Sequence, residues 1–194
     1  MNIHIRITVV AAALLAAALF ATGAAAAEEK YSGYLCCNMR TDGSWISDIN
    51  YAGGGMRLLP LGTPVTITGY GRHRVRVEIN GERQALGNDY SRDLSRAEFA
   101  RRYVLREDPR AQLHAAPEKI QQAIRQSRAT PGMSREQVIM ALGYPVTSEN
   151  PDLDFDLWRY WRDSFAEYQI HFDQGGQVVD ITAEPTLRNL VWLP

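Results

Sequence analysis

Cysteine is scarce in this chain of 194 residues, and charge of neither sign dominates. The only two cysteines, Cys36 and Cys37, are neighbours, so they cannot join distant parts of the chain as the disulfides of small secreted scaffolds do. Packing of a hydrophobic core must therefore hold the fold. The 21 basic and 22 acidic residues leave a formal net charge of −1, and no block of lysine and arginine is sustained. This balance argues against nucleic acid as a partner.

The adjacent cysteines are compatible with three roles. They could be buried thiols or a vicinal disulfide, a link to a second copy of the chain, or a candidate redox pair with a reactive thiolate that needs a nearby base. Lipidation is not expected, because a lipoprotein signal places its cysteine directly after an apolar run, whereas Leu35 and the charged run from Glu28 to Lys30 precede Cys36. The sequence therefore predicts no lipid anchor.

Long apolar runs are also missing, except for one near the start. Arg6 ends a short charged region, and the stretch from Ile7 to Phe20 is rich in alanine and leucine. Small residues then lead to Ala27, after which polarity changes abruptly at Glu28. This order is typical of a cleavable signal peptide, so we predict that residues 1–27 are removed and that the mature protein is exported, soluble in the periplasm or cell envelope. An uncleaved anchor is the alternative, although a spanning helix needs about 20 predominantly apolar residues.

Residues 28–108 have the pattern of a β-rich region that ends in a helix. Val75, Val77 and Ile79 alternate with charged residues, and the run 64–70 alternates in the same way, which predicts a hairpin with one apolar face. The pair Asn80-Gly81 predicts a tight turn into a further strand. Short strands separated by glycine-rich loops are loosely similar to bacterial SH3-like barrels.

Helical signals follow this region. A capping box of Ser95 and Glu98 predicts a helix from about Ser95 to Leu105. Residues 109–131 are expected to form a helical connection, with a helix that begins near Pro117 and runs towards Gln126. A soft boundary between the two halves of the chain, either a linker or a hinge, is expected within 108–116.

Residues 132–194 carry the most specific pattern. A second capping box, Ser134 with Gln137, predicts a helix that ends at Leu142, where Gly143 supplies the C-cap. Three candidate strands follow: Leu157 to Arg162, Glu167 to Phe172 and Gln177 to Ala183. The expected fold class is thus α+β, with a β-rich N-terminal half, a helical connection, and a C-terminal helix packed on a three-stranded antiparallel sheet.

The C-terminal third resembles the SmpA/OmlA (BamE-like) family of outer-membrane assembly proteins. The residues that carry the resemblance are Gly132-Met133-Ser134, Val138, Leu142-Gly143-Tyr144-Pro145, Trp158-Arg159-Tyr160, Tyr168, Ile170, Phe172-Asp173, Gly176 and Val178-Val179. The resemblance implies a helix-on-sheet fold and a non-catalytic, protein-binding role in outer-membrane assembly or maintenance. The same unit is also similar to the repeat of secreted β-lactamase-inhibitory proteins, which bind other proteins too. This chain departs from the family because it lacks the lipidated cysteine and has an additional N-terminal half.

Strand geometry suggests where a partner would bind. Trp158 and Tyr160 are expected to face the core, which leaves Arg159 and Trp161 on the opposite face as candidate partner-binding residues. In the alternative, Trp161 packs beneath the N-terminal half. Tyr34, Trp45 and Tyr51 are further residues that could line such a junction.

Enzymatic roles find little support in the pattern of residues. His73, His114 and His171 are isolated from one another and from any acidic or cysteine set at metal-ligand spacing, so no catalytic, metal or cofactor site is predicted. The alternating Asp152, Asp154 and Asp156 lack the glycine and the terminal glutamate of a calcium loop. Two alternatives remain open at this point: a thiol-dependent cell-wall hydrolase that uses Cys37, and a secreted enzyme inhibitor.

Overall fold

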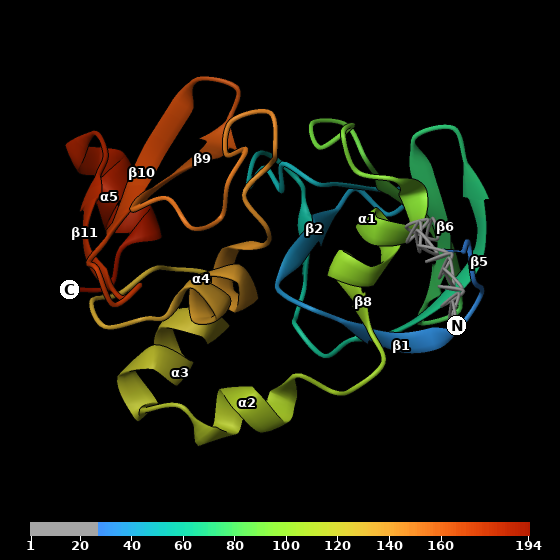
Figure 1. The fold of residues 1–194 in the computed structure, drawn as a ribbon, viewed down its shortest axis with the longest axis horizontal. Helices are drawn as coiled ribbons and strands as arrows, with labels where there is room; N and C mark the ends of the chain where they lie inside the picture. The colour runs from blue at the N-terminus through green and yellow to red at the C-terminus, as the bar shows by residue number, and fades with distance from the viewer. Residues whose placement is uncertain (1–26) are drawn as a thin grey trace, which may run out of the picture.

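The computed structural model describes residues 27–194. The predicted signal peptide, apart from Ala27, lies outside the described residues. The described chain combines five helices with a curled, mixed six-stranded sheet and a three-stranded antiparallel sheet (Figure 1). The predicted α+β class is confirmed. None of the helices in 27–194 is both long and apolar enough to cross a membrane.

The six-stranded sheet fills the N-terminal half. Its strands, in spatial order, are β3 (Trp45–Ser47), β7 (Glu82–Gly87), β6 (Arg74–Ile79), β5 (Pro64–Gly71), β1 (Ser32–Leu35) and β8 (Val104–Leu105). Only the β3–β7 pair is parallel. Two short strands, β2 (Met39–Thr41) and β4 (Arg57–Leu59), pair separately.

The hairpin at the centre of this sheet forms as the alternating pattern predicts. Val65 and Ile67 on β5 face the core together with Val75 and Val77 on β6, while the residues between them are exposed. The Asn80-Gly81 turn has positive φ at both residues, 51° and 79°, which is the conformation that a tight primed turn requires.

The helices are α1 (Arg96–Tyr103), α2 (Arg110–Ala115), α3 (Glu118–Arg125), α4 (Arg135–Leu142) and α5 (Pro185–Val191). Both predicted capping boxes are present, at Ser95 and at Ser134. The first predicted helix is two residues too long, because Val104 and Leu105 leave the helix and pair as β8 with β1. Helix α2 lies within the predicted helical connection 109–131, where the pattern specified only the helix near Pro117, and the pattern did not predict α5.

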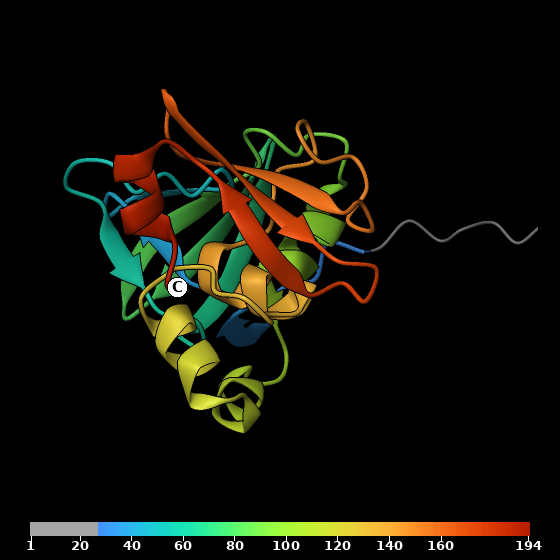
Figure 2. The same ribbon diagram turned by 90° about the vertical axis from the view of Figure 1, so that its left-hand side faces the viewer.

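The C-terminal sheet has the order β11 (Val178–Thr182), β10 (Ala166–Phe172), β9 (Leu157–Asp163), as the three predicted strands require. Its buried face, which includes Trp158 and Ile170, shares a core with α3, α4 and α5. The N-terminal sheet and α1 enclose a second core. Ile139 on α4 packs against both cores, and Figure 2 shows α4 lying between the two sheets.

Candidate functional site

The outward face of the C-terminal sheet is the surface on which the predicted partner-binding residues lie. We call it the outer sheet face. It consists of Leu157, Arg159, Trp161, Glu167, Gln169, His171, Asp180 and Thr182, which alternate with buried residues along the three strands. Trp158 and Tyr160 are buried on the other face, as predicted.

Arg159 lies near the middle of the edge strand β9 on the outer sheet face, and two ion pairs orient its side chain. Its guanidinium forms ion pairs with Glu149 at 3.0 Å and with Glu167 at 3.1 Å, and 40% of its side chain is exposed. Asn150 accepts a hydrogen bond from the backbone N–H of Arg159 and donates one to its carbonyl oxygen, so the edge of β9 is covered at this point. Arg159 is therefore oriented before any partner arrives.

Trp161 lies at the end of the outer sheet face that meets the N-terminal half. Its half-buried side chain and Ile49 line a gap of only about 10 Å³. Nearby, the N–H of Ala52 donates to the carbonyl oxygen of Arg162 at 2.7 Å. Trp161 thus packs against the N-terminal half, which is the alternative to a role in partner binding.

The end of the C-terminal sheet opposite Trp161 carries exposed apolar side chains, of which Leu157 belongs to the outer sheet face. Seven large hydrophobic side chains in 27–194 are exposed, and five of them belong to residues 155–190: Phe155, Leu157, Phe165, Val179 and Leu190. The strand register aligns Leu157 with His171 and Asp180, so Leu157 and Val179 lie at the same end of the sheet. We call Phe155, Leu157 and Val179 the apolar end.

Cys36 and Cys37 form a disulfide with each other in the core of the N-terminal half. Both residues are buried, with at most 4% of either exposed. The chain on each side is tied to helical segments, because the N–H of Cys36 donates to the carbonyl oxygen of Tyr103 and the N–H of Asn38 donates to that of Met140. In this arrangement neither sulfur is a free thiolate, and neither is accessible to a substrate.

The histidines do not gather into a site. His171 lies on the outer sheet face, where its Nε2 is 2.8 Å from the hydroxyl of Thr182. The carbonyl oxygen of His73 accepts a hydrogen bond from the N–H of Asn88 in the N-terminal half. Within residues 27–194, no three His, Cys, Asp or Glu side chains are placed to hold a metal ion.

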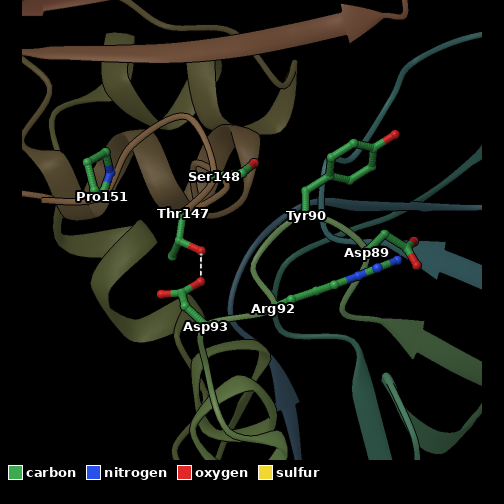
Figure 3. A pocket seen from close by; sticks show the side chains of 7 residues that line it. All are labelled: Asp89, Tyr90, Arg92, Asp93, Thr147, Ser148 and Pro151. Atoms are coloured by element: carbon green, nitrogen blue, oxygen red, sulfur yellow. Dashed lines mark hydrogen bonds between the residues drawn. The ribbon is translucent and has the colours of Figure 1, made fainter.

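A groove of about 590 Å³ lies where the two halves meet (Figure 3). We call it the junction groove. It is formed between the loops 88–94 and 146–151, and its lining residues are Asp89, Tyr90, Arg92, Asp93, Thr147, Ser148 and Pro151. Sites in clefts between packed units are common binding positions, so this groove is a second candidate site.

Asp48 holds the backbone of the loop 88–94 in place. This carboxylate is buried and accepts hydrogen bonds from the backbone N–H groups of Asp89 and Tyr90 at 3.1–3.2 Å. Burial raises the pKa of Asp48 above its ordinary value, and the hydrogen bonds oppose this rise only in part. The loop thus presents its side chains from a fixed backbone.

Direct bonds join the two loops. The N–H of Ser148 donates to the carbonyl oxygen of Tyr90 at 3.1 Å, and the N–H of Thr147 donates to the hydroxyl of Ser91 at 3.2 Å. The hydroxyl of Thr147 also donates to Asp93, as the dashed line in Figure 3 shows. The shape of the groove is therefore set without a ligand.

Sequence reasoning did not find the junction groove. Of the three aromatic residues expected at the junction, Tyr51 lies close to Tyr90 and Trp45 donates a hydrogen bond to Asp89, whereas Tyr34 pairs with Pro64 inside the N-terminal sheet. One feature of the sequence could have indicated the groove. The polar run 88–93 lies between a strand and a helix cap and contains both a tyrosine and an arginine.

Comparison of the chain with protein-family models, with curated proteins and with solved structures found no match. The class of the protein is therefore established only at the level of its α+β architecture.

Proposed function

We propose that this protein is a non-catalytic component of the bacterial cell envelope that binds another envelope protein through its outer sheet face. The observation that carries the proposal is the apolar end, where Phe155, Leu157 and Val179 are 53%, 38% and 51% exposed, and Leu157 precedes the ion-paired Arg159 by two residues on the same face of β9. Exposed apolar side chains near an oriented arginine have the composition that protein–protein interfaces favour.

The architecture supports the same proposal. Helix α4 packs with a three-stranded antiparallel sheet, which is the unit that the resemblance to the SmpA/OmlA family implies. We propose that this half is a BamE-like module and that the curled N-terminal sheet is an SH3-like scaffold attached to it. The partner would then be a subunit that assembles or maintains the outer membrane. Export by a signal peptide cleaved near Ala27, without a lipid anchor, is part of the proposal.

Burial of the apolar end by a partner would contribute to the free energy of binding. Each of its three side chains is about half exposed, so covering one of them would contribute roughly 1 kcal/mol. The contribution from Arg159 is smaller, because Glu149 and Glu167 already satisfy its charge.

The thiol-dependent hydrolase is less favoured, since it needs a free, accessible thiolate and both cysteines are joined and buried.

The test is recovery of partners from solubilised envelopes with a C-terminal tag on the full chain. Wild type is compared with Leu157→Ser, and Leu58→Ser is the matched control, because Leu58 is also 38% exposed but lies on β4 in the N-terminal half. Recovery of one or a few specific envelope proteins that Leu157→Ser loses and Leu58→Ser retains would support the proposal. Equal recovery with all three chains, or none above background, would contradict it.

A further inference from the structure

The junction groove contains oriented polar groups that the proposed protein-binding surface does not use. Acceptors, donors and apolar side chains line it, with Asp89, Tyr90 and Arg92 on one side and Thr147, Ser148 and Pro151 on the other, and Arg92 extends along its own side towards Asp89 (Figure 3). The combination points to a ligand, and the chemistry of each group narrows what that ligand is.

Asp89 is the most firmly positioned of these groups. Its Oδ2 accepts hydrogen bonds from the indole N–H of Trp45 at 3.0 Å and from the hydroxyl of Ser47 at 2.6 Å. The Trp45 ring is itself fixed, because it lies against Gly87 on one side and the guanidinium of Arg74 lies 5.0 Å from its centroid. Within 27–194, Oδ1 of Asp89 accepts none of the hydrogen bonds, so this oxygen of the positioned carboxylate still has the capacity to accept one.

The neighbouring charges alternate in sign. Asp93 accepts a hydrogen bond from Thr147 through Oδ1, and its Oδ2 has no such donor within 27–194. Arg92 lies between the two aspartates in sequence and is exposed, and it forms none of the ion pairs found in the described chain. Arg92 opposes a cationic ligand and the two carboxylates oppose an anionic one. The charges therefore favour a neutral ligand that can both donate and accept hydrogen bonds.

Tyr90 and Pro151 add apolar surface to the groove. Tyr90 is 41% exposed, and its backbone is held by the bond of its N–H to Asp48 and by the bond of its carbonyl oxygen to Ser148. A tyrosine offers a large apolar face at a low cost in conformational entropy. A ligand that matches the groove has hydroxyl groups on its edges and C–H groups on its faces.

We propose that the junction groove binds a neutral oligosaccharide. Asp89 and Asp93 accept hydrogen bonds from sugar hydroxyls, Arg92 and Ser148 donate to ring and hydroxyl oxygens, and a sugar face packs on Tyr90. The volume of about 590 Å³ is within the range of roughly 300–1,000 Å³ that is usual for small-molecule sites. This activity is independent of the outer sheet face.

The test is titration of the purified, exported protein with neutral trisaccharides, namely chitotriose, maltotriose and cellotriose, followed by the backbone amide signals in two-dimensional NMR. We expect at least one of them to shift signals of residues 89–93 and 147–151 in a saturable manner. Asp89→Asn retains an oxygen for Trp45 and Ser47 but turns an amide N–H₂ towards the groove, so it should weaken binding tenfold or more. Tyr90→Ala should do the same, whereas Tyr90→Phe keeps the ring and should weaken binding less than threefold.

The controls make the outcomes distinct. Glu107→Gln changes an exposed carboxylate outside the groove and should bind as wild type does, and so should Leu157→Ser, which alters only the proposed protein-binding surface. Three results would overturn the proposal: no saturable shift at these residues with any of the three sugars, tighter binding of the cationic glucosamine trimer than of chitotriose, or shifts at the groove caused only by an acetylated tripeptide. The last result would assign the groove to polypeptide.

Discussion

The side chain of Asn50 donates hydrogen bonds to the carbonyl oxygens of both Asn38 and Leu142, at 2.9 Å and 2.8 Å. Asn38 belongs to the N-terminal half and Leu142 ends α4, so a single amide group joins the two halves. Asn38 in turn donates to the carbonyl oxygen of Ile124 at 2.6 Å and accepts from the N–H of Leu61 at 3.0 Å. These two buried asparagines therefore hold the N-terminal half against the ends of α3 and α4.

Replacement of Asn38 by alanine should destabilise the protein by about 2–3 kcal/mol, because it leaves a buried N–H and buried carbonyl oxygens without partners. Urea unfolding followed by tryptophan fluorescence measures this loss. Gln174→Ala, on an exposed turn, is the control and should change the free energy of unfolding by less than about 0.5 kcal/mol. A loss from Asn38→Ala no larger than that of the control would show that the junction is not held by this side chain.

Gly143→Ala should destabilise the protein by more than about 1 kcal/mol. Gly143 has a φ of 87°, and a Cβ there would lie 3.3 Å from Nδ2 of Asn50 and 3.4 Å from the sulfur of Met39. Gly54→Ala is the matched control, since a Cβ at Gly54 meets nothing within 4 Å. Thermal unfolding of the two variants should show a lower midpoint for Gly143→Ala alone, and identical midpoints would contradict the packing described at this helix end.

Asp48 should make stability depend on pH in a direction opposite to that of a paired surface carboxylate. Burial raises its pKa in the folded protein, so the folded state holds the proton more tightly than the unfolded chain, whose pKa is about 3.9. Asp48→Asn has no such proton to bind. As the pH falls from 7 to about 4, the free energy of unfolding of the wild type should therefore rise relative to that of Asp48→Asn. Urea titrations at several pH values measure the shift, and a difference that stays constant would contradict the assigned pKa direction.

The cysteines should resist alkylation even in the unfolded chain. Because Cys36 and Cys37 are joined, iodoacetamide in concentrated guanidinium should leave the mass of the exported protein unchanged until a reductant is added, when two groups should be incorporated. Incorporation of two groups without reductant would show free thiols and would restore the thiol-dependent hydrolase as a candidate.

Local patterns in the sequence predicted much of the fold. Capping boxes at Ser95 and Ser134, the Asn80-Gly81 turn and the alternation around Trp158 are signals that lie within a few residues, and all three produced the expected elements. Residues Val104 and Leu105 left the predicted helix because β1, a strand about 70 residues earlier, offers backbone partners. Tertiary pairing of this kind overrides local propensity.

The candidate sites were less predictable, because their geometry depends on contacts between the halves. The side of β9 on which Arg159 and Trp161 lie follows from strand alternation alone. The packing of Trp161 beside Ile49 and the meeting of Tyr90 with Ser148 require the junction, which joins segments about 60 or more residues apart. No local pattern fixes how two such segments meet.

The central proposal is that the outer sheet face contacts an envelope protein, and site-directed photo-crosslinking in living cells tests it most directly. A photoreactive phenylalanine analogue takes the place of Leu157 in one chain and of Leu58 in the other. We predict a discrete crosslinked product from position 157 that contains a second envelope protein and is absent from position 58. The same products from both positions, or no product from position 157, would contradict the account.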